Sequence, residues 1–448
     1  MNTRPVAFLI ILIAACTGGP SAGRGGEPAT PQDSTAYAIR DAFPDSVEQA
    51  MVGAFLQSYG SRVIPLQQAG NYLGEVELLR ELAAGYSGSS GVRNVSGQQI
   101  ATYLSFLGRY REAIALFDSV EGSPPDTTRM RSPGSFDLEG AVAAISGAAD
   151  TAQAIFINEA HHVPQHRALT LALLEPLYAR GFRYFAAETF AAADSALNTR
   201  GYPLRRSGFY TNEPMFGEVV RTAARLGYTL VPYESSGDRN QNDRERGQAQ
   251  NLHQRIFEIA PDARVLVHAG YGHINEGGTI SNASPMAVHF RELTGLDPVT
   301  VDQTTMMEHV DTTLEQPSYR RIVRDRALRV ASVLRDSRTR AVWSARPGIH
   351  DISVVHPVSG LRQGRPIWLW EAGRRKAVRL PVDVCHNTGS CVASAWLASE
   401  SEDAIPVDRI LVEDGMAPPP LLLSPGSYRL VVKDADGTIL SQRDIAVT

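Results

Sequence analysis

The amino-acid sequence predicts an α/β protein, with a mostly parallel sheet flanked by helices, an N-terminal helical segment and a C-terminal β-rich, sandwich-like domain. Three observations support this fold class. Apolar strand-like runs alternate with helical periodicity between residues 154 and 301, which is typical of parallel sheets. Helical periodicity alone precedes this region, and short apolar runs divided by Pro and Gly follow it. The 448 residues leave room for two or three domains.

The first 15 residues have the pattern of a bacterial lipoprotein signal peptide. Arg4 precedes an apolar run that is too short to span a bilayer as a permanent helix, and the run ends in Ile-Ala-Ala-Cys at residue 16. This ending resembles a lipobox, so we predict cleavage before Cys16, diacylation of its thiol and acylation, such as by palmitate, of its amino group. An ordinary signal peptide followed by a chance cysteine is the alternative.

Residues 16–44 are rich in Gly, Pro, Ser and Thr and predict a flexible tether between the lipid and the folded protein. Two lipid-bearing positions on Cys16 would anchor the protein stably to a membrane of the bacterial cell envelope. Residues 17–19 lack the Asp associated with inner-membrane retention, which favours the outer membrane and a periplasm-facing protein. The 43 basic and 48 acidic residues indicate no nucleic-acid partner.

Residues 45–135 are predicted to be helical. The apolar spacing over 100–117 resembles one tetratricopeptide helix pair. Because a single repeat cannot bury its own apolar face, we expect these helices to pack on the next domain. That next domain, residues 136–345, is the predicted α/β domain, and its last predicted helix covers 319–333.

Residues 346–448 form the predicted β-rich domain, with strand-like runs at 352–355, 367–370, 392–397 and 410–412. Cys385 and Cys391 are the two cysteines of the chain besides Cys16. In an exported protein such a pair predicts a disulfide that closes a small loop. Metal binding by the Cys-His-x4-Cys pattern is the alternative, but this pattern lacks a fourth ligand.

Acidic and histidine residues follow four strands of the predicted parallel sheet. The strands cover 154–157, 184–187, 228–233 and 264–269, and the residues at their ends are Glu159 with His162, Glu188, Glu234 and His273. Because parallel strands bring their carboxyl ends to one edge, we expect these side chains to meet there. The irregular region 194–210 predicts a loop over this site. Capping of helix N-termini by the same residues is the structural alternative.

The motifs at this edge are Glu159-Ala160-His161-His162, His166-Arg167, Glu188 and Gly270-Tyr271-Gly272-His273. Their order resembles the superfamily that joins erythromycin-esterase-like hydrolases, ChaN-like haem-binding lipoproteins and TraB/Tiki proteins. Residues 244–251 are similar to the Arg-Asp-Arg-x-Met-Ala-x-Asn helix of the esterase branch, with Glu245 and Gln248 in place of Asp and Met. Asn158 stands where the superfamily most often has Gly. The resemblance covers roughly residues 140–305.

The resemblance implies hydrolysis of a small ester or related bond. His162 would be the general base that activates water, with Glu159 and Glu188 orienting it or exchanging protons, and with His273 completing the base or stabilising developing charge. Substrate binding would fall to Arg167, Arg244, Arg246 and Glu234. A solvated helix face is the alternative for the arginines. The sequence has no Gly-x-Ser-x-Gly elbow and no cysteine in the α/β domain, so direct attack by water is expected.

The same residues are compatible with two other functions. Glu159, His162, Glu188 and His273 could hold a divalent metal such as zinc, as in a TraB/Tiki-like metal-dependent hydrolase. His162, His166 or Tyr271 could instead ligate haem iron, as in a ChaN-like haem-binding lipoprotein. The expected partner is accordingly a small-molecule substrate or haem.

Overall fold

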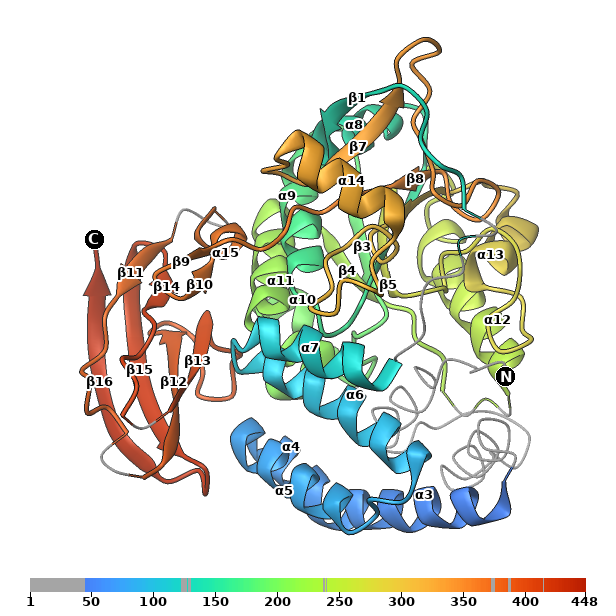
Figure 1. Cartoon of the computed structure of the whole chain (residues 1–448). Coiled ribbons are helices and arrows are strands. Elements are labelled where there is room, and N and C mark those ends of the chain that lie inside the picture. Colours follow the sequence, from blue (N-terminus) through green and yellow to red (C-terminus); the bar gives the residue numbers. More distant parts are fainter. Residues whose placement is uncertain are drawn as a thin grey trace.

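The computed structural model describes residues 45–121, 127, 130–236, 238, 240–371, 375–385, 388–413 and 415–448. Its elements form an N-terminal group of helices, a central parallel sheet flanked by helices, and a C-terminal region of antiparallel strands (Figure 1). This arrangement confirms the predicted fold class. The predicted signal peptide, the tether and Cys16 lie outside the described residues. Among the described helices, none combines the length and apolarity that a bilayer span requires.

The central sheet has six strands in the order β4-β3-β5-β2-β6-β8, and all neighbouring strands are parallel. The strands are β2 (Ala154–Glu159), β3 (Tyr184–Ala187), β4 (Thr229–Pro232), β5 (Val265–Gly270), β6 (Val299–Asp302) and β8 (Ile352–Ser353). Every residue of β2 and β5 is buried, as expected for central strands that are covered on both faces. Because β5 lies between β3 and β2, the carboxyl ends of these three strands are neighbours.

Helices cover both faces of this sheet and divide its side chains between two apolar cores. The larger core takes α8 (Ala141–Ala148), α9 (Gln165–Ala179) and α11 (Pro214–Leu226), and the other takes α12 (Gln241–Leu252), η4 (His253–Phe257) and α13 (Met286–Thr294). Ile155 and Ile157 belong to the larger core, whereas Phe156 belongs to the other. This alternation follows from the two-residue period of a strand.

The N-terminal helices pack against the α/β region and share its larger core. They are α3 (Ser46–Ser58), η1 (Tyr59–Val63), α4 (Ile64–Ala69), α5 (Tyr72–Ala84), α6 (Ser90–Phe106) and α7 (Tyr110–Glu121). From α7, Ile114 packs in a small cluster with Ala160 and Met307. Since Ala160 directly follows β2, helix α7 lies over the carboxyl edge of the sheet.

The segment after β6 differs from the helix predicted over 319–333. Helix α14 (Pro317–Arg326) ends where Ala327 adopts a left-handed conformation with a φ of 45°. The chain then forms β7 (Ser332–Asp336), which pairs antiparallel with β1 (Phe136–Gly140). Cross-strand pairing therefore overrides the helical pattern at the end of this segment.

The parallel sheet also extends past the domain boundary predicted at residue 345. Strand β8 pairs with β6, and Ile352 lies opposite Val301. A strand of two residues is too short to show a periodicity, so its sequence cannot distinguish the parallel sheet from the C-terminal strands.

The C-terminal region is built from antiparallel strands. β13 (Asp408–Glu413), β12 (Ser390–Leu397), β15 (Gly426–Asp434) and β16 (Ile439–Val447) form one sheet in that order, and two smaller pairs join β11 (Lys376–Val378) with β14 (Leu421–Leu423) and β9 (Leu361–Arg362) with β10 (Arg365–Pro366). The strand predicted over 367–370 is instead a short helix, α15 (Ile367–Glu371). This helix buries Leu369 in a cluster with Tyr110 and Met215.

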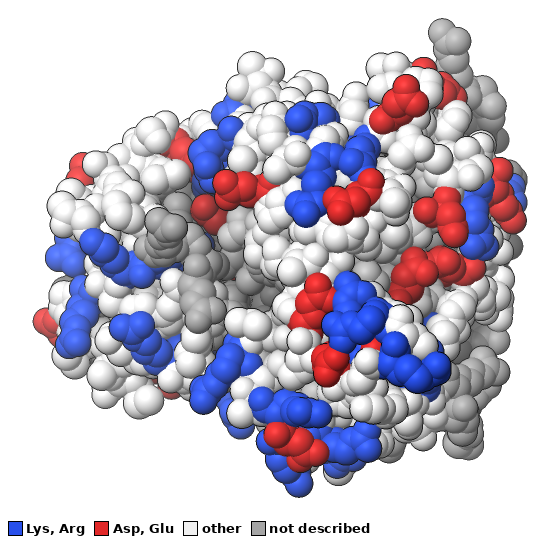
Figure 2. All heavy atoms as spheres, turned by 90° about the horizontal axis from the view of Figure 1, so that it is seen from above, with Lys and Arg blue, Asp and Glu red and all other residues white. Residues whose placement is uncertain are grey.

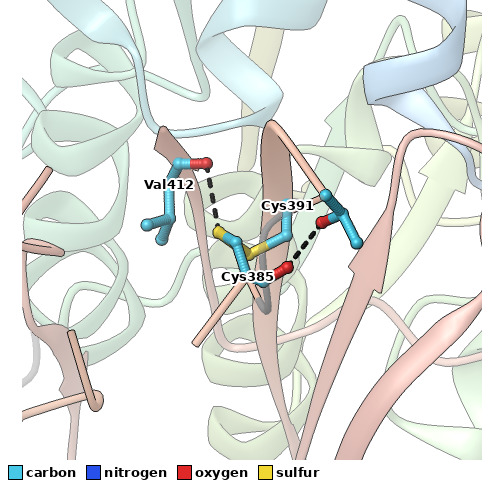
Figure 3. The surroundings of a disulfide bond; sticks show 4 residues. Cys385, Cys391 and Val412 are labelled. Atoms are coloured by element: carbon cyan, nitrogen blue, oxygen red, sulfur yellow. Dashed lines mark hydrogen bonds between the residues drawn. A yellow bond between two sulfur atoms is a disulfide. The ribbon is translucent and has the colours of Figure 1, made fainter. Parts of the chain in front are cut away.

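Cys385 and Cys391 form the predicted disulfide (Figure 3). Both residues are buried in the apolar core of the C-terminal strands. Cys385 Sγ lies 3.5 Å from the carbonyl oxygen of Val412 in β13. The disulfide therefore ties the loop before β12 into this core, while His386 of the alternative metal pattern lies outside the described residues.

Candidate functional site

Three neighbouring strands place acidic and histidine residues at one edge of the sheet. Glu159 is the last residue of β2, Glu188 directly follows β3, and β5 ends at Gly270, three residues before His273. The side chains of Glu159, Glu188 and His273 are almost completely buried. Glu234 lies two residues after the edge strand β4. The sheet order therefore brings together the ends of strands that are up to about a hundred residues apart in the sequence.

The carboxylate of Glu159 accepts four hydrogen bonds within the protein. Arg167 donates from Nε and Nη2 over 2.7 and 2.8 Å. His161 Nδ1 lies 2.9 Å from Oε1, and His268 Nε2 lies 2.9 Å from Oε2. Burial disfavours the charged carboxylate, but Arg167 and His268 outweigh burial and hold the pKa of Glu159 well below its usual range. Glu159 is therefore an ionised anchor for two histidines.

Arg167 links Glu159 to a second buried carboxylate, that of Glu213. Arg167 Nη1 donates to Glu213 Oε2 over 3.2 Å, and its Nη2 also donates to the carbonyl oxygen of His161 over 2.9 Å. Glu213 in turn caps α11, because its Oε2 accepts a hydrogen bond from the backbone N–H of Phe216. Each guanidinium nitrogen of Arg167 has a partner within the protein, so this residue positions the site.

His161 is the histidine that joins the carboxylate cluster. Its ring stacks on that of Tyr210, with 3.8 Å between the centroids and 13° between the planes. Because Nδ1 faces the ionised Glu159, Nδ1–H donates to the carboxylate and Nε2 carries the lone pair. Nε2 is buried and has no hydrogen-bond partner among the described residues. An imidazole held in this way has the arrangement of a general base.

Gly270 allows the two halves of the site to approach each other. A Cβ atom added at this position would lie 2.5 Å from His161 Nε2 and 3.1 Å from Glu188 Oε2. The backbone N–H of Gly270 also donates to Glu188 Oε2 over 2.6 Å. His161 Nε2 and Glu188 Oε2 therefore border the same small volume at the end of β5.

A second guanidinium organises the Glu188 side of the site. Arg244 of α12 donates from Nη2 to Glu188 Oε1 over 2.9 Å and from Nε to Glu234 Oε1 over 3.0 Å. Its Nη1 lies 3.2 Å from His273 Nε2. His273 Nδ1 lies 2.9 Å from Oε2 of the buried Glu245. Nε and Nη2 of Arg244 are therefore engaged by carboxylates of the protein itself.

The charges of this second cluster shift the pKa values of its members. Burial alone would raise the pKa of Glu188, but His273 and Arg244 lower it to about 2. Burial alone would lower the pKa of His273, but Glu245 and Glu188 raise it. Glu188 is thus held as an anion, while His273 is favoured in its protonated form beside the guanidinium of Arg244. Three carboxylates, those of Glu188, Glu234 and Glu245, therefore surround Arg244 and His273.

Two predicted site residues lie apart from these clusters. His162 stacks on Phe117 of α7, with 3.8 Å between the centroids, and its ring nitrogens have no hydrogen-bond partner in the described part of the chain. Burial lowers the pKa of His162 well below its usual value, and His309 and His161 add to this effect. Arg246 is exposed on α12. The position that sequence reasoning assigned to His162 is occupied by its neighbour His161.

The three side chains predicted as alternative haem ligands, those of His162, His166 and Tyr271, contact different parts of the protein. His166 is completely buried, and its ring lies 4.9 Å from that of His356. Tyr271 packs edge-on against His161 at 5.1 Å. Because His162 packs against α7 instead, these residues do not fit a shared set of ligands for one haem iron.

The carboxylates do not fit a metal centre either. The oxygens of Glu159 and Glu188 that a cation would need are bonded to Arg167 and Arg244. Within the described ranges, no group of three or more His, Cys, Asp or Glu side chains is placed to hold a metal ion. The donor set matches internal ion pairs rather than zinc coordination.

Four residues that complete the site were given no role in hydrolysis from the sequence, namely His268, Glu213, Glu245 and Tyr210. His268 offered a signal, because a histidine inside an otherwise apolar strand needs a polar partner when it is buried. Tyr210 ends the region that was predicted to cover the site. Glu245 stood in the motif over residues 244–251, but without an assigned role. Glu213 offered no signal, since its role depends on partners in distant segments.

A groove of about 710 Å³ lies outside the site, between the start of α7 and the C-terminal region, and none of the site residues lines it. Its lining includes Arg109, Leu361 and Met416. On the face shown in Figure 2, basic and acidic side chains are interspersed rather than gathered by sign.

Comparison with known proteins does not assign a family. No family model matches the chain, and no curated protein matches it. Three similar solved structures are the type III effector HopBA1 (12% identity, 42% of this chain and 94% of that chain, TM-score 0.27), a structure described as "Bacterial protein toxins" (10%, 53% and 56%, 0.31) and RRSP, a MARTX toxin effector domain from Vibrio vulnificus CMCP6 (13%, 48% and 46%, 0.27). The chain spans about half the length of the second and third. Likenesses at these TM-scores carry no argument about function.

Proposed function

We propose that this protein is a hydrolase that cleaves a small ester or related bond by direct attack of water, with His161 as the general base. The α/β region would then be related to the erythromycin-esterase-like, ChaN-like and TraB/Tiki superfamily. The setting we propose is a lipoprotein of the bacterial cell envelope, anchored through Cys16. One observation carries the proposal: Glu159 holds His161 Nδ1 while Nε2 is unpartnered among the described residues and lies beside Glu188.

The geometry supports a mechanism with one water molecule. Water that binds beside His161 Nε2 loses a proton to this nitrogen as its oxygen attacks the carbonyl carbon of the ester. The ionised Glu159 stabilises the imidazolium that forms. The electron pair of the carbonyl bond moves to the carbonyl oxygen as the tetrahedral intermediate forms. The intermediate then expels the alkoxide, which takes the proton from His161.

Replacement of the two adjacent histidines tests the proposal. In the full chain, His161→Asn should lower the hydrolysis of p-nitrophenyl acetate by about 100-fold or more, because it removes the base. His162→Asn is the matched control, since His162 is equally buried but lies against Phe117, and its turnover should stay within about threefold of the original chain. Melting temperatures check that both variants fold.

The opposite pattern would contradict the proposal. Loss of turnover in His162→Asn with full turnover in His161→Asn would return the base to His162. A chain that hydrolyses no ester of a p-nitrophenyl acetate, butyrate and octanoate series, but that shows a Soret band with haem or stoichiometric zinc, would support the binding alternatives instead.

A further inference from the structure

Tyr210 lies in the site without taking part in its hydrogen-bond network. It begins η3 (Tyr210–Asn212), and its backbone N–H donates to Thr189 Oγ1 over 2.8 Å, which fixes it beside the residue after Glu188. Its ring stacks face to face on His161. The guanidinium carbon of Arg167 lies 5.9 Å from the ring centroid. The phenol is therefore held in one place by contacts of its ring and backbone.

The hydroxyl of Tyr210 has no hydrogen-bond partner within the described residues, although only 5% of the residue is exposed. A buried hydroxyl without a partner destabilises a folded protein, whereas a phenylalanine at the same place would keep the ring contacts without this penalty. The stacking on His161 accounts for the ring but not for the oxygen. We therefore expect the hydroxyl to bind a molecule that is not part of the protein.

The surroundings of Tyr210 keep this hydroxyl a donor. Burial raises the pKa of Tyr210 well above its usual value, and the negative charge of Glu188 raises it further. Another buried polar atom without a partner in the described part of the chain, His161 Nε2, belongs to the ring on which Tyr210 stacks. A hydrogen-bond donor and a proton acceptor, both without partners among the described residues, therefore belong to two stacked rings.

We propose that Tyr210 is a further catalytic residue, whose hydroxyl donates a hydrogen bond to the carbonyl oxygen of an uncharged acyl substrate. This inference rests on the proposed hydrolase function. As water attacks, the electron pair of the C=O bond moves to the oxygen, which then accepts a stronger hydrogen bond from Tyr210. On collapse the carbonyl bond forms again, the bond to the leaving alkoxide breaks, and the alkoxide takes the proton held by His161.

The substrate class follows from the state of the two arginines. Arg167 and Arg244 bind Glu159, Glu213, Glu188 and Glu234, so neither is free to neutralise a substrate carboxylate or phosphate. Among the described residues, the buried site atoms without a protein partner include the Tyr210 hydroxyl, His161 Nε2 and Glu213 Oε1, and none of them belongs to a free guanidinium. Such a site takes an ester without charge near the reacting carbonyl rather than an anionic one.

Two tyrosine substitutions in the full chain distinguish this role from a structural one. Tyr210→Phe should lower kcat for p-nitrophenyl acetate by about 100-fold with KM within about twofold, while the melting temperature stays equal or rises. Tyr228→Phe is the matched control, because its hydroxyl is buried but donates to the carbonyl oxygen of Leu174 over 2.7 Å. This control should keep kcat and lower the melting temperature by about 1–3 °C.

The outcomes separate the two proposals. If Tyr210→Phe keeps kcat within about threefold while His161→Asn loses it, Tyr210 is not catalytic and the hydrolase function stands. If His161→Asn also keeps its turnover, or if the original chain has none, the proposed function itself is overturned together with this inference.

Discussion

Gly270 is the residue on which the approach of the two carboxylate clusters depends. It ends β5, donates its N–H to Glu188, and leaves room for the imidazole of His161 where any other residue would place a Cβ atom. The requirement is steric and local. A substitution at this position therefore tests the placement of His161 without changing any charge of the site.

Gly270→Ala should therefore displace His161. The added Cβ would lie 2.4 Å from Cε1 and 2.5 Å from Nε2 of the imidazole, closer than real Cβ atoms approach other heavy atoms. We expect the free energy of unfolding in urea to fall by about 1–3 kcal/mol, with loss of ester turnover. Gly147→Ala in α8 is the control, because a Cβ there meets nothing within 4 Å. A Gly270→Ala variant as stable and active as the original chain would contradict the geometry.

The adjacent residues His161 and His162 show what a sequence motif leaves open. After β2 the chain turns, and the N–H of Val163 donates to the carbonyl oxygen of Ala160 over 2.8 Å. This turn directs His161 toward Glu159 and His162 toward Phe117. The spacing of residues after a strand identified the cluster, but the direction of each side chain depends on turn geometry that the motif does not encode.

At the scale of elements, the short strand β8 carries a buried histidine into the α/β region. His356 lies three residues beyond β8, and its Nε2 lies 3.0 Å from Oε1 of Gln303, which follows β6. Burial lowers the pKa of His356 to about 4, and it lowers the pKa of the neighbouring His166 well below its usual value. These elements are thus packed around neutral imidazoles.

This packing predicts a loss of stability in mild acid. A histidine whose pKa is lower in the folded state binds more protons when the chain unfolds, so its contribution is complete above about pH 6.5 and is lost as the pH falls toward 4. For His356 the loss between pH 7 and pH 5 is about 2 kcal/mol. Between pH 7 and pH 5, the free energy of unfolding in urea should therefore fall by about 2 kcal/mol less in His356→Gln than in the original chain. Parallel curves for the variant and the original chain would contradict the buried neutral state.

The elements differ in how well their sequences predict them. Strands β2 and β5 are runs of buried apolar residues, and their neighbouring helices have clear periodicity, so the parallel sheet and its polar edge could be predicted. The strand-like run that contains β8 was assigned to the C-terminal domain and helix α15 was predicted as a strand, because these elements are only two and five residues long. Their conformation is set by contacts with segments that are distant in the sequence.

At the scale of the whole molecule, the C-terminal strands support the loop that carries the site. Arg409 of β13 donates to the carbonyl oxygens of Phe106 and Asn212 over 3.2 and 3.3 Å, and its guanidinium lies over the ring of Tyr72 at 4.6 Å. Asn212 directly precedes Glu213 and is two residues after Tyr210 in the sequence. One buried arginine therefore joins the helices, the C-terminal strands and the site loop.

This arrangement explains why the sequence could not indicate the roles of some site residues. Glu213 and Glu245 acquire their roles through Arg167 and His273, which lie on other elements. Periodicity and strand ends predict where a site forms, because they follow from backbone geometry. The pairing of buried charges depends on how whole helices and strands pack together, so it cannot be predicted from a local sequence pattern.

The tautomer of His161 decides whether this residue can act as the general base, and it can be measured without a substrate. Long-range ¹H–¹⁵N spectra of the chain with ¹⁵N-labelled histidine, assigned with His161→Asn and recorded at pH 8, report which ring nitrogen carries the proton. The structure predicts a proton on Nδ1, donated to Glu159, and a bare Nε2. A proton on Nε2 with a bare Nδ1 would contradict this account, because that Nε2 could not accept a proton from water.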